Sequence, residues 1–384
     1  MKKLFKNIID SELRFFASRV IKKFKPFIIG VTGSSGKTTE KYMIVQLLKA
    51  SGKSVNTSET NLNTRTGLPM SILGFSRSPE NPLDWLGVFF SSCVRYFALR
   101  TFPDFLVVEF AADKPGDINY LASFIRPQIA VITNIGVAHI EIFKNVKNIT
   151  KEKWSLAQAA ENHIIISSSD YDKVKDRAAS AQVTKIEEGP VKIKKREILS
   201  NKTEFEVQLF EKKFSTQTKF LGAHNLLNIQ LALTACYFAG CDFYKMVKKI
   251  PGLEPRTGRG KRTIGRNEIM IIDESYNANP LSMIAALENL ASVKYARKVA
   301  IIGQMAEIGP VKQRSHQEVA VFAKKCADFV VGVGEDFRGQ NLDKWYPNVE
   351  ELIEEIETVV LKGDAVLIKG SHSTNLDKVV DRLT

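Results

Sequence analysis

The sequence predicts an α/β fold, with a central domain built around a mostly parallel sheet and a smaller doubly wound, Rossmann-like domain at its C-terminal end. Two observations support this prediction. Short runs rich in β-branched residues alternate with helix-length stretches, and the alternation stops and restarts around a linker rich in Gly, Pro and Arg. Such alternation is typical of parallel sheets that carry helices on both faces. The predicted segments are therefore 1–25, 26–252 and 253–384.

The first segment, 1–25, is predicted to be a basic amphipathic helix. Eight Lys and Arg residues outnumber Asp10 and Glu12, so its local charge is 8 − 2 = +6. One apolar stripe recurs at helical spacing and consists of Phe5, Ile9, Leu13, Phe16, Val20 and Phe24. A signal peptide would need a continuous apolar core, which is missing. Two interpretations remain, a helix lying on an anionic membrane or a helix docked on the protein's own core, and docking is favoured because most amphipathic helices pack internally.

The central segment, 26–252, begins as a strand–helix series. The predicted strands are 27–31, 105–110, 129–135 and 163–167, and the predicted helices include 37–51, 117–125, 146–161 and 225–239. Between 191 and 220 the pattern changes to short alternating runs, which we expect to add antiparallel strands to the same sheet. The aromatic-rich stretch 85–102 has two interpretations, core packing or contact with a lipid-linked substrate, and core packing is favoured.

The C-terminal segment, 253–384, begins within the linker 251–260, where Gly, Pro and Arg cluster. A second alternating series then predicts strands at 269–273, 299–303, 329–333 and 365–369, with helices between them. This arrangement predicts the smaller doubly wound domain, in which ligands bind beyond the carboxyl ends of the strands.

Composition limits the function without fixing it. The 384 residues are 44% hydrophobic and 25% charged, as in an ordinary soluble protein, and no transmembrane run of about 18 apolar residues occurs. A net charge of +13 suits an anionic partner, but the basic residues lack the aromatic-interleaved pattern of a nucleic-acid groove. The four cysteines form no CxxC pair, which favours a reduced, cytoplasmic setting.

The strongest local signal is a glycine-rich loop between the strand 27–31 and the helix that follows it. The loop comprises Gly33, Ser34, Ser35, Gly36, Lys37, Thr38 and Thr39. Backbone N–H groups of such a loop surround phosphate oxygens, and the helix N-terminus adds its positive dipole end. Lys37 would reach the β- and γ-phosphates of a nucleotide, and the Thr38 hydroxyl would bind Mg²⁺. The sequence therefore predicts a nucleotide-binding site rather than a plain glycine turn.

The motifs along residues 26–384 resemble the Mur ligases, and most of all the D-alanyl-D-alanine-adding MurF branch. Thr32–Thr39 is similar to the family's ATP loop. Further matches, in the family's order, are Asn61-Leu62-Asn63 with Gly67-Leu68-Pro69, Glu109 with Pro115–Ile118, Thr133-Asn134-Ile135 with His139, Gly222 with His224, Asn225 and Asn228, Gly258-Arg259, Asp273–Pro280, and Lys369-Gly370-Ser371.

The resemblance implies an ATP-dependent ligase that activates a carboxylate as an acyl phosphate and then joins it to an amine. Thr38 and Glu109 supply the hard oxygen ligands that suit one Mg²⁺ ion. The family further implies a second Mg²⁺ near His139, reached by a lysine carbamylated by CO₂. By position that lysine is Lys153, although Lys151 is close and Ser155 replaces the family's usual acidic residue. The alternative for both lysines is a solvated helix face.

The resemblance also assigns residues outside the loop. Arg259 is expected to hold a phosphate, and the expected nucleoside contacts are Asn225, Glu274, Tyr276, Asn277 and Asn279. Lys369 and Ser371 are expected to bind the incoming amino acid, and Asn61 and Asn63 to lie on the substrate side. The substrate is then a small-molecule or peptide precursor, not a nucleic acid.

The resemblance departs from the family at the N-terminal end, where only residues 1–25 precede the loop and the UDP-gripping domain of MurF-like enzymes is expected to be absent. The function predicted first is addition of an amino acid or D-Ala-D-Ala to a peptidoglycan-type precursor. The alternatives are a Mur-family ligase with another acceptor (lipid-linked muropeptide, polyglutamate or folate), and a ligation-deficient ATP-binding scaffold subunit. A partner subunit and peripheral membrane contact through residues 1–25 remain open.

Overall fold

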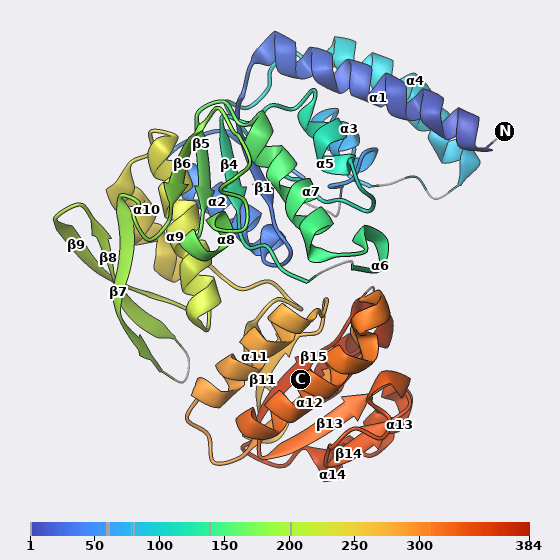
Figure 1. Cartoon of the computed structure of the whole chain (residues 1–384), viewed down its shortest axis with the longest axis vertical. Coiled ribbons are helices and arrows are strands. Elements are labelled where there is room, and N and C mark those ends of the chain that lie inside the picture. Colours follow the sequence, from blue (N-terminus) through green and yellow to red (C-terminus); the bar gives the residue numbers. More distant parts are fainter. Residues whose placement is uncertain are drawn as a thin grey trace. The chain divides into compact units, whose positions relative to one another are not determined.

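A computed structural model of the chain describes residues 2–58, 62–77, 79, 81–137, 140–199, 202–306 and 308–384 (Figure 1). The chain divides into two compact units. The first unit contains Met1–Ile135, Lys147–Val191 and Gln230–Lys249, and the second contains Gly136–Val146, Lys192–Ile229 and Ile250–Thr384. Each unit is described by itself below.

The first unit is built on a parallel sheet of six strands among the described residues, in the order β2-β3-β1-β4-β5-β6. The strands are β1 (Phe27–Thr32), β2 (Val55–Thr57), β3 (Phe105–Glu109), β4 (Ile129–Ile132), β5 (His163–Ile166) and β6 (Gln182–Lys185). β1, β3 and β4 are almost wholly buried, because helices cover parallel sheets on both faces. The predicted strands are confirmed, and the short edge strands β2 and β6 were missed.

The helices of this unit lie between the strands in sequence, as a parallel sheet requires. They are α2 (Lys37–Ala50), α3 (Gly67–Ile72), α4 (Pro82–Ala98), α5 (Asp117–Ala122), α7 (Val146–Ala159), α8 (Ser168–Tyr171), α10 (Phe243–Lys249) and part of α9 (Ala223–Phe238). α2 packs against β1, β2 and β3 as well as against α10. This packing fixes the loop between β1 and α2.

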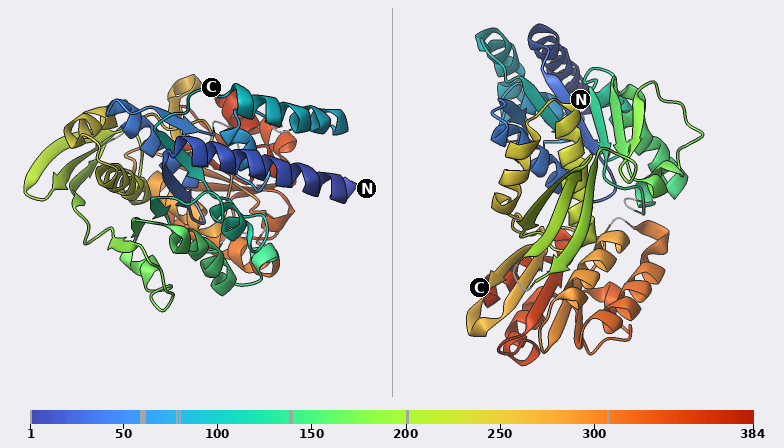
Figure 2. Two further views of the ribbon diagram at one scale, coloured as in Figure 1. Left: turned by 90° about the horizontal axis from the view of Figure 1, so that it is seen from above. Right: turned by 90° about the vertical axis from the view of Figure 1, so that its left-hand side faces the viewer.

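The helix α1 (Lys2–Phe24) docks on its own unit, which confirms the favoured interpretation of residues 1–25. It packs against α3 and α4, and Figures 1 and 2 show α1 and α4 side by side. Ile9, Leu13 and Val20 of the predicted stripe are fully buried. The side chain of Phe5 lies outside the described residues. Within the part of the chain that the structure describes, no helix is long and apolar enough to cross a membrane.

The stretch 85–102 differs from its prediction. It forms most of α4, and only Val88 and Ser92 of this helix are buried among the described side chains. Phe90 and Phe97 are each 67% exposed, so core packing was the wrong prediction for them. The physical reason is that α4 packs against α1, whereas Phe90 and Phe97 lie where this packing leaves the helix exposed.

The second unit contains a six-stranded sheet, counted over its described residues, in the order β10-β11-β15-β12-β13-β14. All neighbours are parallel except β10, which pairs antiparallel with β11. Its strands are β10 (Lys261–Ile264), β11 (Met270–Glu274), β12 (Lys298–Gly303), β13 (Phe329–Val333), β14 (Lys344–Tyr346) and β15 (Ala365–Lys369). The four predicted strands are confirmed, and the short edge strands β10 and β14 were missed.

Two apolar clusters cover the two faces of this sheet. Alternate strand residues point to opposite faces, so Met270 and Ile272 belong to one cluster while Ile271 belongs to the other. The first face is covered by α11 (Pro280–Ser292) and α12 (Lys312–Cys326), and the second by α13 (Val349–Glu354), α14 (Ile356–Val359) and α15 (Asp377–Leu383). The predicted doubly wound architecture is therefore confirmed.

The antiparallel strands between 191 and 220 form a sheet of their own, in the order β7-β8-β9. They are β7 (Val191–Ile198), β8 (Thr203–Leu209) and β9 (Lys212–Thr218). The expected addition to the first sheet was wrong, because the edge of that sheet is β6. A short helix, α6 (Ile140–Phe143), also falls in the second unit.

Candidate active site

The glycine-rich loop follows β1 directly and leads into α2, as the sequence predicts. A Cβ atom on Gly33 would meet Thr133 Oγ1 at 2.0 Å, so this position requires glycine. Gly36 caps α2 with a φ of 78°, which favours glycine as well. The first N–H groups of the 14-residue helix have no intrahelical acceptor and can bind an anion.

Thr133 and Asn134, just after β4, hold the loop in place. The backbone N–H of Ser34 donates to the Asn134 carbonyl at 3.0 Å, and that of Ser35 donates to Asn134 Oδ1 at 3.0 Å. Thr133 Oγ1 donates to the Ser35 carbonyl at 2.6 Å. The N–H groups of Ser34 and Ser35 therefore position the loop here. Phosphate binding by Lys37, Thr38 and Thr39 at the helix start stays a prediction.

Two predicted metal ligands meet next to the loop. Thr38 Oγ1 donates to Glu109 Oε2 at 2.9 Å, and Asn63 Nδ2 donates to Glu109 Oε1 at 3.1 Å. Val31 of β1 pairs with Glu109 of β3, so the strand register brings the loop and the carboxylate together. Glu109 is buried, and a hydroxyl beside a carboxylate is an oxygen donor set that suits Mg²⁺. Asn61 and His139 lie outside the described residues.

The lysine predicted for modification is buried on α7. Lys153 is 3% exposed, whereas its rival Lys151 is exposed on the same helix. Burial, together with the positive charge of Lys37, lowers the pKa of Lys153 to about 7, against the opposing charges of Glu152, Glu109 and Asp113. About half of the Lys153 amine is therefore neutral near pH 7, and the neutral amine is the form that reacts with CO₂.

Two neighbours of Lys153 on α7 have structural roles. Glu152 accepts hydrogen bonds from the backbone N–H groups of Gly116 and Ile118, at 2.7 and 2.8 Å, and so caps the start of α5. Ser155 Oγ, at the place of the family's usual acidic residue, donates to the Lys151 carbonyl at 3.1 Å. This departure therefore leaves Lys153 in its buried position.

Lys37 lies at the first position of α2, where its ammonium group donates to the Gly33 carbonyl at 2.9 Å. Its charge acts on Lys153, which shows that the two side chains belong to one electrostatic site. The charge of Lys37, next to the N–H groups at the start of α2, favours the binding of an anion there. The first unit thus gathers the predicted Lys37, Thr38, Glu109 and Lys153.

Another buried carboxyl group, that of Glu40 on α2, has no assigned role in this chemistry. Glu40 is fully buried, neither of its carboxyl oxygens has a hydrogen-bond partner among the described residues, and burial raises its pKa well above the usual value. The folded protein therefore keeps this proton to a higher pH than the unfolded chain does.

Glu40→Gln is expected to become more stable, relative to wild type, as the pH rises. A raised folded-state pKa gives stability that is complete below about pH 4.5 and is lost above it as the unfolded chain releases the proton. Thermal unfolding at pH 5 and pH 8 measures this, and the melting temperature of the variant should gain several degrees on wild type at the higher pH. An equal difference at both pH values would contradict the assignment.

In the second unit, Arg259 and Tyr276 form a stacked pair. The Arg259 guanidinium lies 3.9 Å from the centre of the Tyr276 ring, and this ring stacks on His372 at 6.1 Å. A flat ring beside a guanidinium is a surface on which a nucleobase or a phosphate can bind. The His372 contact was not predicted, because 96 residues separate it from Tyr276.

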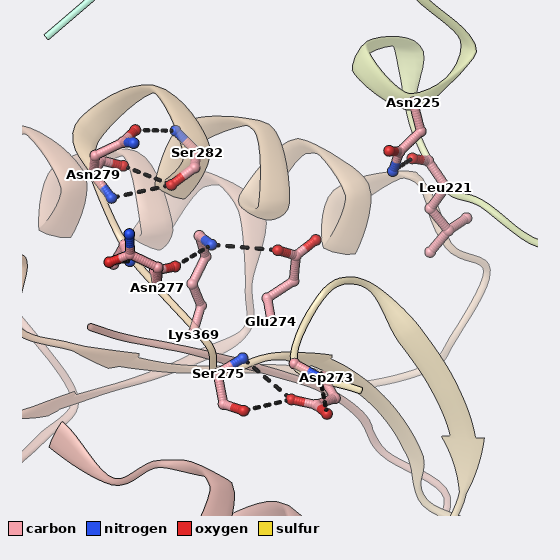
Figure 3. A network of polar contacts seen from close by, with 11 residues as sticks. Leu221, Asn225, Asp273, Glu274, Ser275, Asn277, Asn279, Ser282 and Lys369 are labelled. Carbon is pink, nitrogen blue, oxygen red and sulfur yellow. Dashed lines mark hydrogen bonds and ion pairs between the residues drawn. The ribbon is translucent and has the colours of Figure 1, made fainter. Parts of the chain in front are cut away.

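Lys369 is at the centre of the polar network in Figure 3. It is 2% exposed, and its ammonium group donates to Glu274 Oε2 at 3.3 Å and to the Asn277 carbonyl at 2.9 Å. Strand register explains the meeting, since Lys369 of β15 pairs with Glu274 of β11. Ser371 is also buried, and its Oγ accepts from the Ala306 N–H at 2.8 Å.

The asparagines of the predicted nucleoside site bond mainly to nearby backbone. Asn277 Oδ1 accepts from the Ala278 N–H at 2.8 Å, and Asn279 Oδ1 caps α11 by accepting from the Ser282 N–H at 2.9 Å. Asn225 donates to the Leu221 carbonyl at 2.8 Å, and no contact drawn in Figure 3 joins it to the Lys369 network. These side chains shape loops, so their contact with a nucleoside stays a prediction.

Comparisons with known proteins decide the family. The model of the Mur ligase middle domain matches residues 31–236, and that of the Mur ligase glutamate ligase domain matches residues 258–372. The chain belongs to the Mur ligase family. The UDP-N-acetylmuramoyl-tripeptide–D-alanyl-D-alanine ligase of Bacillus subtilis is 26% identical over 97% of this chain and 79% of its own length.

Solved structures agree with this assignment. MurF of Thermotoga maritima in complex with ADP has a TM-score of 0.80 at 26% identity, and covers 98% of this chain and 83% of its own. MurF of Acinetobacter baumannii shares the fold with a TM-score of 0.81 at 24% identity, over 97% and 79% of the two chains. This Mur ligase is therefore an enzyme, an ATP-dependent ligase similar to the MurF branch.

The cap on α11 gives this Mur ligase a residue whose structural role can be measured. Asn279→Ala removes one member of a reciprocal capping box and is expected to reduce the free energy of unfolding by about 1 kcal/mol. Asn279→Asp keeps the acceptor and should unfold at the wild-type urea concentration. Unchanged stability in Asn279→Ala, with a raised KM for ATP, would instead assign this side chain to the nucleoside.

Proposed function

We propose that this Mur ligase joins D-alanyl-D-alanine to the carboxylate of a peptidoglycan-type peptide precursor. The observation that carries the proposal is the assembly of Lys37, Thr38, Glu109 and Lys153 in one unit of a chain that is similar over 97% of its length to an enzyme named for this reaction. The geometry supports the reaction type, and the names of the relatives support the two substrates.

The first step makes the carboxylate reactive. An oxygen of the substrate carboxylate attacks the γ-phosphorus of ATP, the bond to the β-phosphate oxygen breaks, and ADP leaves an acyl phosphate behind. Phosphoryl transfer needs positioning and charge neutralisation more than it needs covalent chemistry. The N–H groups at the start of α2 bind phosphate oxygens, and Lys37 moves from the Gly33 carbonyl to the γ-phosphate.

Mg²⁺ supplies electrostatic stabilisation of the transferred phosphoryl group when it is bound. Thr38 and Glu109 would hold it, because their oxygens already lie 2.9 Å apart and Asn63 orients the carboxylate. We assign Asn63 to this orienting role as well as to the substrate side. A second ion is proposed near His139 and Lys153.

We also propose that Lys153 is carbamylated. Its neutral amine attacks CO₂, a C–N bond forms, one proton is released, and the side chain becomes anionic. The change would turn two neighbouring cations, Lys37 and Lys153, into an opposite-charge pair. Burial of Lys153 and exposure of Lys151 support the choice between the two lysines.

In the second step, the amine of the incoming dipeptide attacks the acyl carbon, the C–O bond to phosphate breaks, and the amine loses a proton. Arg259 is proposed to hold a phosphate, and its partner Tyr276 to stack on the nucleoside together with contacts from Asn225, Glu274, Asn277 and Asn279. Lys369 and Ser371 are proposed near the incoming carboxylate. Lys369 would bind this carboxylate while its ammonium group also donates to Glu274 and to the Asn277 carbonyl.

The proposal is tested with purified protein, ATP, Mg²⁺, UDP-N-acetylmuramoyl-tripeptide and D-alanyl-D-alanine. Phosphate release should require both acceptor substrates, and mass spectrometry should show one product that has gained the dipeptide with loss of water. Replacing the precursor with folate or with a polyglutamate acceptor separates the other family activities. Phosphate release that is indifferent to every acceptor, or no product mass, would overturn ligation.

A further inference from the structure

The helix α4 exposes an apolar face that the proposed reaction does not use. Leu86, Phe90, Val94 and Phe97 follow one another at spacings of four, four and three, which places them on one side of the helix. Leu86 is 41% exposed and the other three are 66–67% exposed. Single exposed apolar residues are ordinary, but a whole helix face of them indicates an interaction surface.

This face continues onto α1. The two helices run parallel, because Ser92 donates to Glu12 at 2.7 Å and, one turn further along both helices, the Phe16 and Tyr96 rings lie 5.5 Å apart. Ring contacts of 5.2 Å join Phe16 to the half-exposed Phe15, and Tyr96 to Phe97. The α1–α4 face is therefore one surface, made of Ile8, Phe15, Leu86, Phe90, Val94 and Phe97.

The acidic residues of α1 face the rest of its unit, whereas several of its basic residues face solvent. Its acidic residues are engaged within the unit, Asp10 by Thr66 at 2.6 Å and Glu12 by Ser92. Among the described side chains of α1 and of the residue that follows it, the exposed basic ones are Arg19, Lys22, Lys23 and Lys25. These cations cluster at the C-terminal end of α1, beside the end of α4 and the exposed Arg100.

We propose that the α1–α4 face docks this enzyme peripherally on an anionic lipid membrane. Aromatic and aliphatic side chains enter the boundary between headgroups and acyl chains, while adjacent Lys and Arg residues bind acidic headgroups. A second copy of the chain fits less well, because a segment with a charge of +6 would face the same positive segment. Both helices belong to the first unit, so the surface does not depend on the second.

The docking test is co-sedimentation of the full chain with vesicles. Vesicles of phosphatidylcholine and phosphatidylglycerol should pellet the protein, pure phosphatidylcholine vesicles should pellet it less, and high salt should weaken binding. Phe90→Ser/Phe97→Ser is expected to lower the partition coefficient about tenfold or more, because two rings no longer enter the apolar layer. Arg19→Gln/Lys22→Gln/Lys25→Gln should remove the preference for the anionic lipid.

A matched control, Phe210→Ser/Tyr244→Ser, replaces two aromatic residues outside the α1–α4 face. Each of them is 63% exposed in the wild type. This variant should bind vesicles like wild type, and all variants should keep the wild-type melting temperature because the replaced side chains are on the surface. Equal binding by Phe90→Ser/Phe97→Ser and wild type would overturn the proposal. So would a wild-type dimer in light scattering that the same double substitution converts to a monomer.

Discussion

Lys37→Met is expected to reduce kcat for ligation by roughly 10²- to 10³-fold, the loss typical of removing one preorganised group that stabilises the transition state. Methionine keeps the length and apolar part of the side chain but removes the charge. The γ-phosphate carries most of the negative charge that moves during the first step, so the defect should fall on kcat more than on binding of the peptide precursor. ADP release in a coupled assay measures it.

The same helix offers a matched control for this experiment. Lys49 is exposed in the last turn of α2, 12 residues after Lys37, and Lys49→Met makes the same chemical change outside the site. Its kcat should equal that of wild type. If both variants lost activity equally, the effect would be one of folding or net charge, and the role of Lys37 in phosphate binding would be excluded.

Most of the fold was predictable because its central strands are buried on both faces. The residues of β13 and β15 are almost all apolar, and both strands begin and end at the predicted residues. β2, β6, β10 and β14 lie at sheet edges, are only three or four residues long, and contain polar residues that are at least partly exposed to solvent. Their position depends on a neighbouring strand, which a local pattern does not contain.

The site was predictable where one stretch of chain builds it. The loop from Gly33 to Thr39 contains its own strand, turn and helix start, so its location follows from local sequence. The anchoring of this loop by Asn134 depends instead on the pairing of β1 with β4, which joins residues about 100 positions apart. From the sequence, Asn134 was only part of a match to the family, and its role in anchoring the loop was not predicted.

One local signal was available and was missed. Asn279-Pro280-Leu281-Ser282 has a capping residue, proline at the first helical position and a hydroxyl at the third, which together predict the start of α11. The capping role of Asn279 follows from that pattern without any structure. The exposure of Phe90 and Phe97 is a different case, because an apolar helix face predicts burial and only the surrounding fold shows what covers it.

Lys153→Ala is expected to abolish measurable ligation, and small carboxylates such as formate or acetate should restore part of it by replacing the lost anion. Lys151→Ala, on the same helix but exposed, should keep wild-type activity. After loading with ¹³CO₂, carbon NMR should show one carbamate signal in wild type and in Lys151→Ala but none in Lys153→Ala. A signal that persists in Lys153→Ala would place the modification elsewhere.

The pH dependence of this modification follows from the lowered pKa. Only the neutral amine reacts with CO₂, and with a pKa of about 7 for Lys153 its neutral fraction rises as the pH increases through this value. The neutral fraction is about one tenth at pH 6 and about nine tenths at pH 8. Enzyme stripped of CO₂ should therefore regain activity roughly ten times faster at pH 8 than at pH 6 when dissolved CO₂ is held constant. An exposed lysine, with a pKa near 10.5, would still gain reactivity steeply above pH 8, so a reactivation rate that levels off above about pH 8 identifies the buried residue.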